Sequence, residues 1–371
     1  MDKRELSKLK KGFKLDNKGS LEVLALATTY CKQEADKMKV IFTDINSFEY
    51  LEEELIEKYY TNSKKLLSGG FGAKLFDLNI NSSEKGSDIQ KFLYTMLDEN
   101  NFENNIDKLV DKIIGEINYG TDVVITTILA QSFIPRPKKS SKDEEEDDNY
   151  HKYILCSINK LESCCKEVNI DTVNKAVSLG NSEVIINMRK PIEGFMFPSI
   201  TDFRSDVNKV LYCTGSANQV NEKLTQEVLQ CENFLTASQE KNIFHSVVKG
   251  TVGEEISLKT ISDVITTIAE EKINNIEGTI SAQKLGDILE AKGIENANDV
   301  LTGIVTDMDT MIKIDNIVPN GSKAVKLNNS DITLSVGAGA ISKVSQTKKN
   351  GKKCLVIELD ENVNLDGFKI I

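Results

Sequence analysis

The chain has 371 residues, of which 40% are hydrophobic and 28% are charged, and its formal net charge is -11 at pH 7. This composition is typical of globular proteins, and the length is sufficient for two or three domains with separate cores. No apolar run approaches the roughly 18 to 20 residues of a membrane span, and the first residues are charged, unlike those of a signal peptide. We therefore expect a cytoplasmic protein without a membrane partner.

The charge is distributed unevenly along the chain. Residues 1–18 carry seven Lys or Arg against three Asp or Glu, a balance of +4, and residues 311–371 carry nine against six, a balance of +3. The centre therefore carries a net charge of -18. An acidic centre repels phosphate, so any contact with nucleic acid is expected at the two ends.

The cysteines and histidines predict no metal site and no cofactor. The seven cysteines are odd in number, include no Cys-x-x-Cys spacing, and in three cases fall inside apolar strand patterns, which favours buried thiols. His151 starts a predicted strand and His245 lies on a predicted helix. Neither has partners at the spacing of a zinc site or a nucleophilic triad, so we interpret both as structural.

The first third of the chain is predicted to contain a basic helix, two strands and three further helices. Leu6, Leu9 and Phe13 share one face of the basic helix, and packing of that face on the body is favoured over a membrane or partner contact. Residues 21–30 and 38–42 read as two strands joined by a turn. Apolar stripes at helical spacing follow at Leu51, Leu55, Ile56 and Tyr59, at Phe92, Leu93, Met96 and Leu97, and at Ile106, Leu109, Val110, Ile113 and Ile117.

Residues 69–74, Gly-Gly-Phe-Gly-Ala-Lys, combine glycines and a lysine as phosphate-binding loops do. A P-loop needs four residues between its glycines and a Ser or Thr after the lysine, whereas Leu75 follows Lys74 here. The segment also trails a helix instead of a strand. We interpret it as a helix C-cap and turn.

Two β-rich runs, residues 121–133 and 150–158, enclose a highly charged segment. Residues 135–149 hold four basic residues and then an acidic run, and so offer almost nothing to bury. We predict that this segment is a mobile hairpin loop without a role of its own.

A polar turn at residues 201–206 separates two apolar strand patterns. Asp202, Arg204 and Asp206 alternate along it, and alternate residues of an extended segment point the same way, so they can hold a cation or an anion. A turn with a local ion pair is the simpler interpretation. A hydrolase or phosphoryl-handling enzyme that uses these three residues is the alternative.

The middle of the chain is predicted to be helical. Ser216 with Gln219 and Thr236 with Gln239 match capping boxes, which open two helices. Residues 285–305 then predict two helices joined by a glycine-containing turn, the outline of a DNA-reading motif. The second helix lacks Lys and Arg and carries four carboxylates, so we interpret the pair as a helical hairpin in a core.

The residues after a turn at 319–321 are predicted to be all strand, with a tight hairpin at Lys349-Asn350-Gly351-Lys352. Lysines cluster around that hairpin and on the first helix. The candidate polyanion-binding residues are Lys348, Lys349, Lys352 and Lys353, with Lys3, Arg4, Lys8, Lys10 and Lys11 as a second patch. Lysines that protect an exposed sheet edge would explain the hairpin cluster equally well.

Three segments carry a resemblance to a known family. Residues 193–213, 66–75 and 153–158 resemble an uncharacterised bacterial protein family found mainly in clostridia. The closing segment, from residues 331–336 through 368–370, fits the same family, so the resemblance covers most of the chain. It implies no activity. The last sixty or so residues are also similar to the end of the 37-kilodalton nucleoid-associated proteins, without a diagnostic motif.

The expected fold is α+β in three parts. These are a mixed domain at residues 1–215, a helical region at 216–310 and a small β-rich module at 311–371. The favoured function is that of a non-enzymatic cytoplasmic binding or scaffolding protein, associated with nucleic acid or the nucleoid through its basic ends. A factor bound to the ribosome or to another protein is the first alternative, and the enzyme that uses Asp202, Arg204 and Asp206 is the second.

Overall fold

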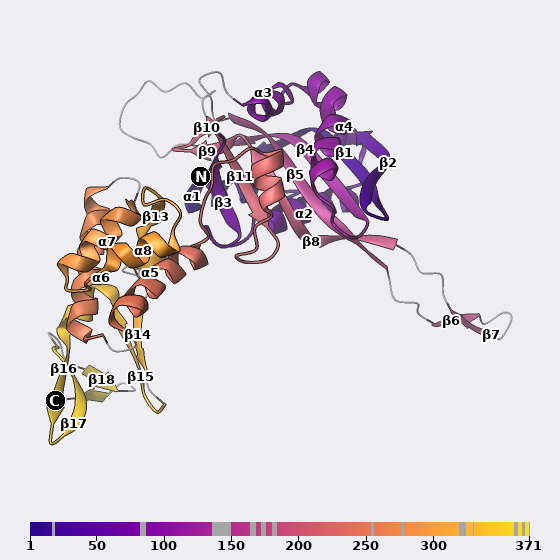
Figure 1. Ribbon diagram of the computed structural model, residues 1–371. Coiled ribbons are helices and arrows are strands. Elements are labelled where there is room, and N and C mark those ends of the chain that lie inside the picture. The colour runs from indigo at the N-terminus through magenta and orange to yellow at the C-terminus, as the bar shows by residue number, and fades with distance from the viewer. Residues whose placement is uncertain are drawn as a thin grey trace, which may run out of the picture. The chain divides into compact units, whose positions relative to one another are not determined.

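Figure 1 shows the fold as a computed structural model of the chain. The structure describes residues 1–16, 19–81, 87–135, 150–163, 168–171, 176–179, 184–253, 256–275, 278–318, 324–328, 330–359, 363–365 and 368–370. Helices and a large antiparallel sheet are both present, which confirms the predicted α+β class. The chain divides into two compact units, Met1–Phe234 and Leu235–Ile371.

The first unit is built on a seven-stranded sheet. The strands lie in the order β2-β1-β4-β5-β8-β11-β3, and each neighbouring pair is antiparallel. They are β1 (Leu21–Glu34), β2 (Lys37–Asn46), β3 (Leu75–Asn79), β4 (Val123–Phe133), β5 (Tyr150–Ser163), β8 (Val184–Phe197) and β11 (Lys209–Thr214). Two short hairpins are added by β6 (Val168–Asp171) with β7 (Ala176–Leu179), and by β9 (Ser199–Thr201) with β10 (Arg204–Asp206).

The strand pairs expected from the sequence are present. β1 pairs with β2, and β4 pairs with β5 from Val123 opposite Lys160 to Phe133 opposite Tyr150. Residues 136–149, which make up nearly all of the predicted hairpin loop between β4 and β5, lie outside the described residues.

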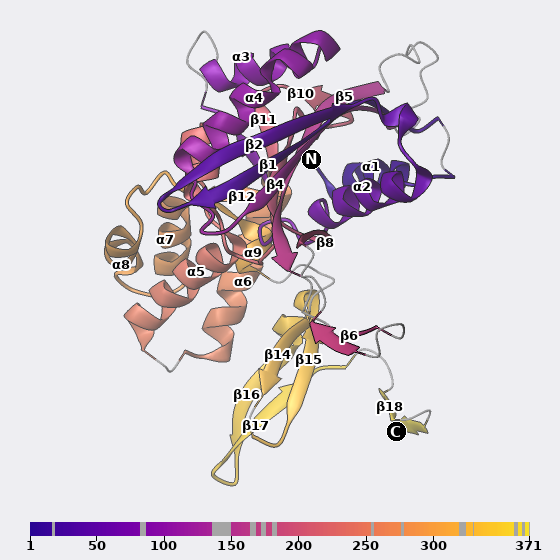
Figure 2. The same ribbon diagram turned by 90° about the vertical axis from the view of Figure 1, so that its right-hand side faces the viewer.

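Successive side chains along each strand point to opposite faces of the sheet, and a layer of helices covers each face. On β5, Ile154 and Cys156 face one layer and Leu155 faces the other. The first layer contains α3 (Asp88–Thr95), α4 (Glu99–Glu116) and the π-helix η3 (Lys223–Val228), and the second contains α1 (Lys3–Gly12), the short η1 (Phe48–Tyr50) and α2 (Glu53–Leu66). Figure 2 shows α3 and α4 on one side of the sheet and α1 and α2 on the other. The apolar face of α1 is therefore buried against the sheet, as the sequence predicts.

The segment after β11 differs from the sequence prediction. The Gln219 NH donates to the Ser216 carbonyl at 3.3 Å within a turn, and η3 begins only at Lys223. The predicted capping box at Ser216 is therefore wrong. The Asn221 NH donates instead to the Tyr212 hydroxyl of β11 at 3.1 Å. This bond fixes the segment on the sheet, so the helix begins later in the sequence than predicted.

The residues of η3 and the turn after it belong to the first unit. Leu224, Val228 and Leu229 are part of its core, and Cys231 forms a β-bridge with Ile80 beside the edge strand β3. The unit consequently ends at Phe234, later than the boundary at residue 215 that composition suggested.

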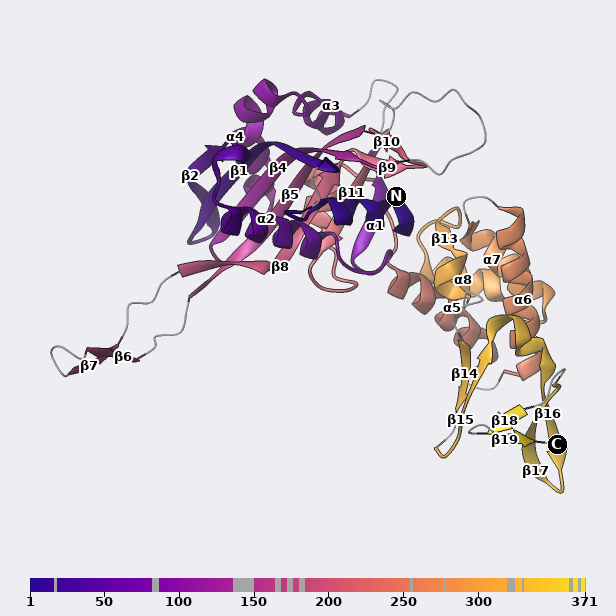
Figure 3. The ribbon, with the colours of Figure 1, turned by 180° about the vertical axis from the view of Figure 1, so that it is seen from behind.

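The second unit combines a helical core with short hairpins (Figure 3). Its helices are α5 (Ala237–Val252), α6 (Leu258–Asn274), α7 (Ala282–Ala291), α8 (Ala297–Ile304), α9 (Ile314–Ile317) and the 3-10 helix η4 (Ala338–Lys343). Its strands pair as β12 (Thr279–Ser281) with β13 (Met311–Lys313), β14 (Ala324–Asn328) with β15 (Thr333–Gly337), β16 (Val344–Lys349) with β17 (Lys352–Ile357), and β18 (Val363–Leu365) with β19 (Phe368–Ile370).

Local signals in the second unit are confirmed. The Thr236 side chain accepts from Gln239 and the Gln239 side chain accepts from Thr236, which completes the capping box of α5. The predicted helical hairpin is the pair α7 and α8, whose apolar residues lie in the core. Asn350 and Gly351 have φ of 52° and 76°, as a type I′ turn requires.

The described cysteines are mostly buried thiols. Cys31, Cys156, Cys213 and Cys231 are buried, and burial raises the pKa of Cys31 to about 12. Cys164 and Cys165 lie outside the described residues.

Candidate functional site

A pocket of about 880 Å³ lies in the first unit, lined by residues of α2, β5, β8 and the segment that follows β11. Its cationic lining residues are Lys65, Lys74, Lys160, Arg189 and Lys190. Glu193 is the only carboxylate among the described residues that line it. We refer to this depression as the basic pocket.

A large bulge in β8 brings Arg189 and Lys190 to the basic pocket. β8 pairs with β5 at Ile186 and again at Pro191, so the four residues between them lie opposite a single residue of β5, Lys160. Extra residues in one strand of a pair bend that strand and redirect its side chains. The bulge therefore brings together three of the five cations of the basic pocket, namely Lys160, Arg189 and Lys190.

Three buried polar side chains hold this bulge in place. Asn159 donates to the Asn187 carbonyl at 2.8 Å, and Asn62 of α2 donates to the Met188 carbonyl at 3.1 Å and to Asn159 at 3.0 Å. Ser157 donates to Asn62 at 2.5 Å. Because buried polar groups of a bulge must find partners inside the protein, this network fixes the path of residues 187–190.

The floor of the basic pocket is a buried carboxylate. Glu193 is 4% exposed and accepts hydrogen bonds from the Tyr212 hydroxyl at 3.0 Å and from the Asn221 amide at 2.8 Å. Burial raises the pKa of Glu193, and these hydrogen bonds oppose the rise. The Tyr119 hydroxyl is buried close to Glu193 without completing an aligned hydrogen bond, and burial raises its pKa well above the usual range.

The arrangement favours an anionic ligand. Among the described lining residues five cations stand against the single carboxylate of Glu193, so positive charge is in excess. Lys65, Lys160, Arg189 and Lys190 are exposed, while Lys74 donates to the Gly215 carbonyl at 2.6 Å and holds the segment after β11. Lys and Arg side chains that converge in a concave site concentrate positive potential there.

A second depression, of about 420 Å³, lies between α1 and α2. The described residues that line it include no carboxylate. Its cationic residues are Lys3, Lys10, Lys11, Lys14 and Lys64, and Leu6 and Phe71 add apolar surface. We refer to it as the lysine groove. Three lysines of the predicted N-terminal patch, Lys3, Lys10 and Lys11, thus line one depression.

The other two residues of that patch lie elsewhere. Arg4 is exposed on α1 outside the groove lining. Lys8 lies over the Phe203 ring, with Nζ 4.6 Å from the ring centroid, and donates to the Pro135 carbonyl. Lys8 therefore has a local structural role, and the sequence pattern of alternating lysines did not distinguish it from its neighbours.

The predicted C-terminal lysines face one another across the hairpin of β16 and β17. Lys348 lies opposite Lys353, and Lys349 lies opposite Lys352. All four side chains are exposed. Like charges directly opposite each other destabilise a strand pair, so a polyanion that bound here would relieve the repulsion.

The polar turn at residues 201–206 forms a tight hairpin tip. Asp202 and Phe203 have φ of 51° and 57°, so the chain turns between Thr201 and Arg204, as the predicted polar turn requires. Asp206 accepts from the Asn208 NH at 3.1 Å. Across the described parts of the chain, no ion pair involves Asp202, Arg204 or Asp206.

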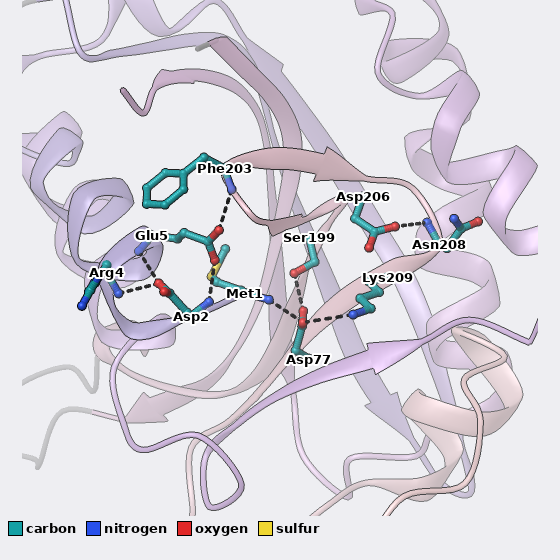
Figure 4. Close-up of polar contacts among 10 residues, drawn as sticks. All are labelled: Met1, Asp2, Arg4, Glu5, Asp77, Ser199, Phe203, Asp206, Asn208 and Lys209. Atoms are coloured by element: carbon teal, nitrogen blue, oxygen red, sulfur yellow. Dashed lines mark hydrogen bonds and ion pairs between the residues drawn. The ribbon is translucent and has the colours of Figure 1, made fainter. Parts of the chain in front are cut away.

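Figure 4 shows how this hairpin docks on the start of the chain. The Phe203 NH donates to Glu5 of α1 at 2.7 Å. Below it, Asp77 of β3 accepts from the Met1 amino group and from Ser199, and lies 4.0 Å from the Lys209 ammonium. These contacts hold the hairpin of β9 and β10 against α1 and β3, so a structural role accounts for the polar residues around it.

The surroundings of the two histidines are consistent with structural roles. His151 is buried at the start of β5 with Nδ1 3.1 Å from the Ser205 hydroxyl. Burial, together with Lys241 and Lys249, lowers the pKa of His245 on α5. Within the described residues, no cluster of three His, Cys, Asp or Glu side chains is arranged to hold a metal ion.

Comparison with known proteins identifies the family. The family described as "Domain of unknown function (DUF4317)" matches residues 1–368. The chain belongs to this family. No curated protein matches the chain significantly. Of the helices in the described ranges, none is both long enough and apolar enough to cross a membrane.

Sequence reasoning missed the basic pocket. Its cations lie at positions 65, 74, 160, 189 and 190, so local stretches of the sequence such as 65–74 and 189–190 contain no more than two of them. One local signal was available, because Glu193 stands at the start of the otherwise apolar run Gly194–Ile200. A carboxylate beside a buried strand needs partners and often marks a site.

Proposed function

We propose that this chain is a non-enzymatic, cytoplasmic binding protein that takes an anionic ligand in the basic pocket. The observation that supports this most is the set of five cations around one concave site in a chain of net charge -11. A cluster of cations on a protein whose net charge is negative creates a local positive potential, and this potential attracts phosphate or carboxylate groups to the cluster.

Binding is favoured over catalysis by the state of Glu193. A general base must come within hydrogen-bond reach of the substrate proton, and Glu193 is only 4% exposed, with its carboxylate held by Tyr212 and Asn221. The hydrolase alternative at Asp202, Arg204 and Asp206 receives less support, because those residues stand at a hairpin tip outside both depressions.

Calorimetric titration with pyrophosphate tests the proposal. We expect saturable binding that weakens as salt rises, and a loss of at least tenfold in affinity for the double variant Lys160→Glu and Arg189→Glu. Lys37→Glu with Lys39→Glu is the matched control, because β2 is separated from β8 by three strands and the charge change is the same. Equal affinities of the two double variants, or no binding to the unaltered protein, would refute the pocket as the site.

A further inference from the structure

We infer that the ligand of the basic pocket is a single-stranded nucleic acid whose backbone continues into the lysine groove. This inference rests on the proposed function and adds the ligand class and the second contact surface. Three observations support it: the two depressions adjoin, their charge exceeds what one small anion neutralises, and each is lined by a partly exposed aromatic residue.

The two depressions are joined along the end of α2. Lys64 lines the lysine groove and its neighbour Lys65 lines the basic pocket. Across the boundary, Lys10 of the groove donates to the Ser68 hydroxyl of the pocket at 3.0 Å. Burial and the charge of Lys65 lower the pKa of Lys10, so positive potential from both depressions overlaps at this residue. The two sets of cations therefore meet at the end of α2, where a bound chain can pass from one depression to the other.

The charge of the combined surface suits a repeating anion. The described linings contribute ten cations, five in each depression, against the single buried carboxylate of Glu193. One phosphate group cannot contact cations that are spread over α1, α2, β5 and β8. A polyanion contacts them in succession, and the release of its condensed counterions provides a favourable free energy that depends on salt.

The aromatic side chains distinguish nucleic acid from other polyanions. Phe71 lines the lysine groove and Tyr119 lines the basic pocket, and both residues are partly exposed. Proteins that bind single strands combine a cationic groove for the backbone with aromatic rings on which bases stack. An acidic peptide or polyphosphate has no such faces. A duplex keeps its bases stacked inside a stiff rod, so it cannot place them on rings that line concave depressions.

Fluorescence anisotropy with labelled oligothymidylates of about 4, 8 and 16 nucleotides, a range typical of single-strand sites, tests the inference. We expect affinity to rise with length until both depressions are filled, and the logarithm of affinity to fall with the logarithm of salt by about 0.7 per contacted phosphate. Lys14→Glu with Lys64→Glu in the groove should remove most of the gain with length and leave the shortest oligonucleotide unaffected. Lys160→Glu with Arg189→Glu in the pocket should weaken all lengths.

A second set of variants tests stacking separately from charge. Phe71→Leu keeps an apolar side chain of similar bulk, and Phe71→Tyr keeps the ring. We expect the leucine variant to lose about 5- to 100-fold in affinity for the longest oligonucleotide and the tyrosine variant to stay near the original value. Thermal melting of each variant verifies that the fold is retained.

The outcomes separate this inference from the proposed function. If pyrophosphate binds in the basic pocket but long oligonucleotides bind no tighter than short ones, the inference is wrong and the proposed function stands. Equal affinity for duplex DNA or for polyglutamate of matched charge would also overturn the inference. If neither pyrophosphate nor any oligonucleotide is affected by the pocket variant, both are wrong.

Discussion

The Tyr212 hydroxyl donates a hydrogen bond of 3.0 Å to the Glu193 carboxylate, and the two residues lie on neighbouring strands of the central sheet. Tyr212 is opposite Phe195 in the register of β11 and β8, so Glu193 is its diagonal neighbour on the same face. Asn221, seven residues beyond the end of β11, supplies the second donor. The floor of the basic pocket is therefore set by strand register as well as by side-chain type.

The raised pKa of Glu193 predicts a pH-dependent stability. A carboxyl whose pKa is higher in the folded than in the unfolded chain favours folding while it is protonated, and this contribution is lost as pH rises through the folded pKa. The free energy of unfolding of the unaltered protein, relative to Glu193→Gln, should therefore decrease from about pH 4, near the unfolded pKa, towards pH 7. Urea denaturation at several pH values measures it. A difference that is independent of pH would contradict the assignment.

The buried network behind the bulge predicts a link between stability and ligand affinity. Asn62→Ala removes the donor to the Met188 carbonyl and the nearer acceptor of the Ser157 hydroxyl, which should cost about 1 to 3 kcal/mol in unfolding free energy. It should also weaken pyrophosphate binding, because residues 187–190 lose a support. Ser63→Ala is the control, since Ser63 is equally buried on α2 but bonds only to the Tyr59 carbonyl. Equal pyrophosphate affinity in both variants would show that the network does not place the cations.

Asp77 joins the start of the chain to the hairpin of β9 and β10. Asp77→Asn should lower the unfolding free energy by about 1 to 3 kcal/mol, because the amide is uncharged and can no longer accept fully from both Met1 and Ser199. Lys209→Gln should have a smaller effect, since its ammonium lies at 4.0 Å and is partly exposed. Chemical denaturation compares the two. A larger loss for Lys209→Gln would mean that the ion pair, and not the hydrogen bonds, holds this junction.

The lysine pairs across β16 and β17 predict that a charge reversal stabilises this hairpin. Lys353→Glu places opposite charges at the pair with Lys348, which should gain about 0.2 to 1 kcal/mol. Adding Lys348→Glu restores like charges, so the double variant should lose that gain. Thermal or urea unfolding of the second unit measures the cycle. Additive effects of the two substitutions would show that the side chains do not interact.

The sequence predicted those elements whose signals are local. The apolar face of α1, the capping box of Thr236 and Gln239, and the turn at Asn350 and Gly351 each depend on residues within about one helical turn or one hairpin. Hydrophobic periodicity and turn chemistry act over that range, so neighbouring residues suffice to specify them. The family was likewise identifiable from segments of the sequence, because it covers residues 1–368.

The basic pocket was decided by tertiary structure alone. Its cations come from positions as far apart as 65 and 190, and they meet only because the order of strands places α2, β5 and β8 side by side. The failed capping box at Ser216 has the same cause, since the Tyr212 hydroxyl of β11 binds the Asn221 NH and overrides the local helix signal. Contacts between residues distant in sequence depend on strand order and register, which no local pattern in a single chain contains.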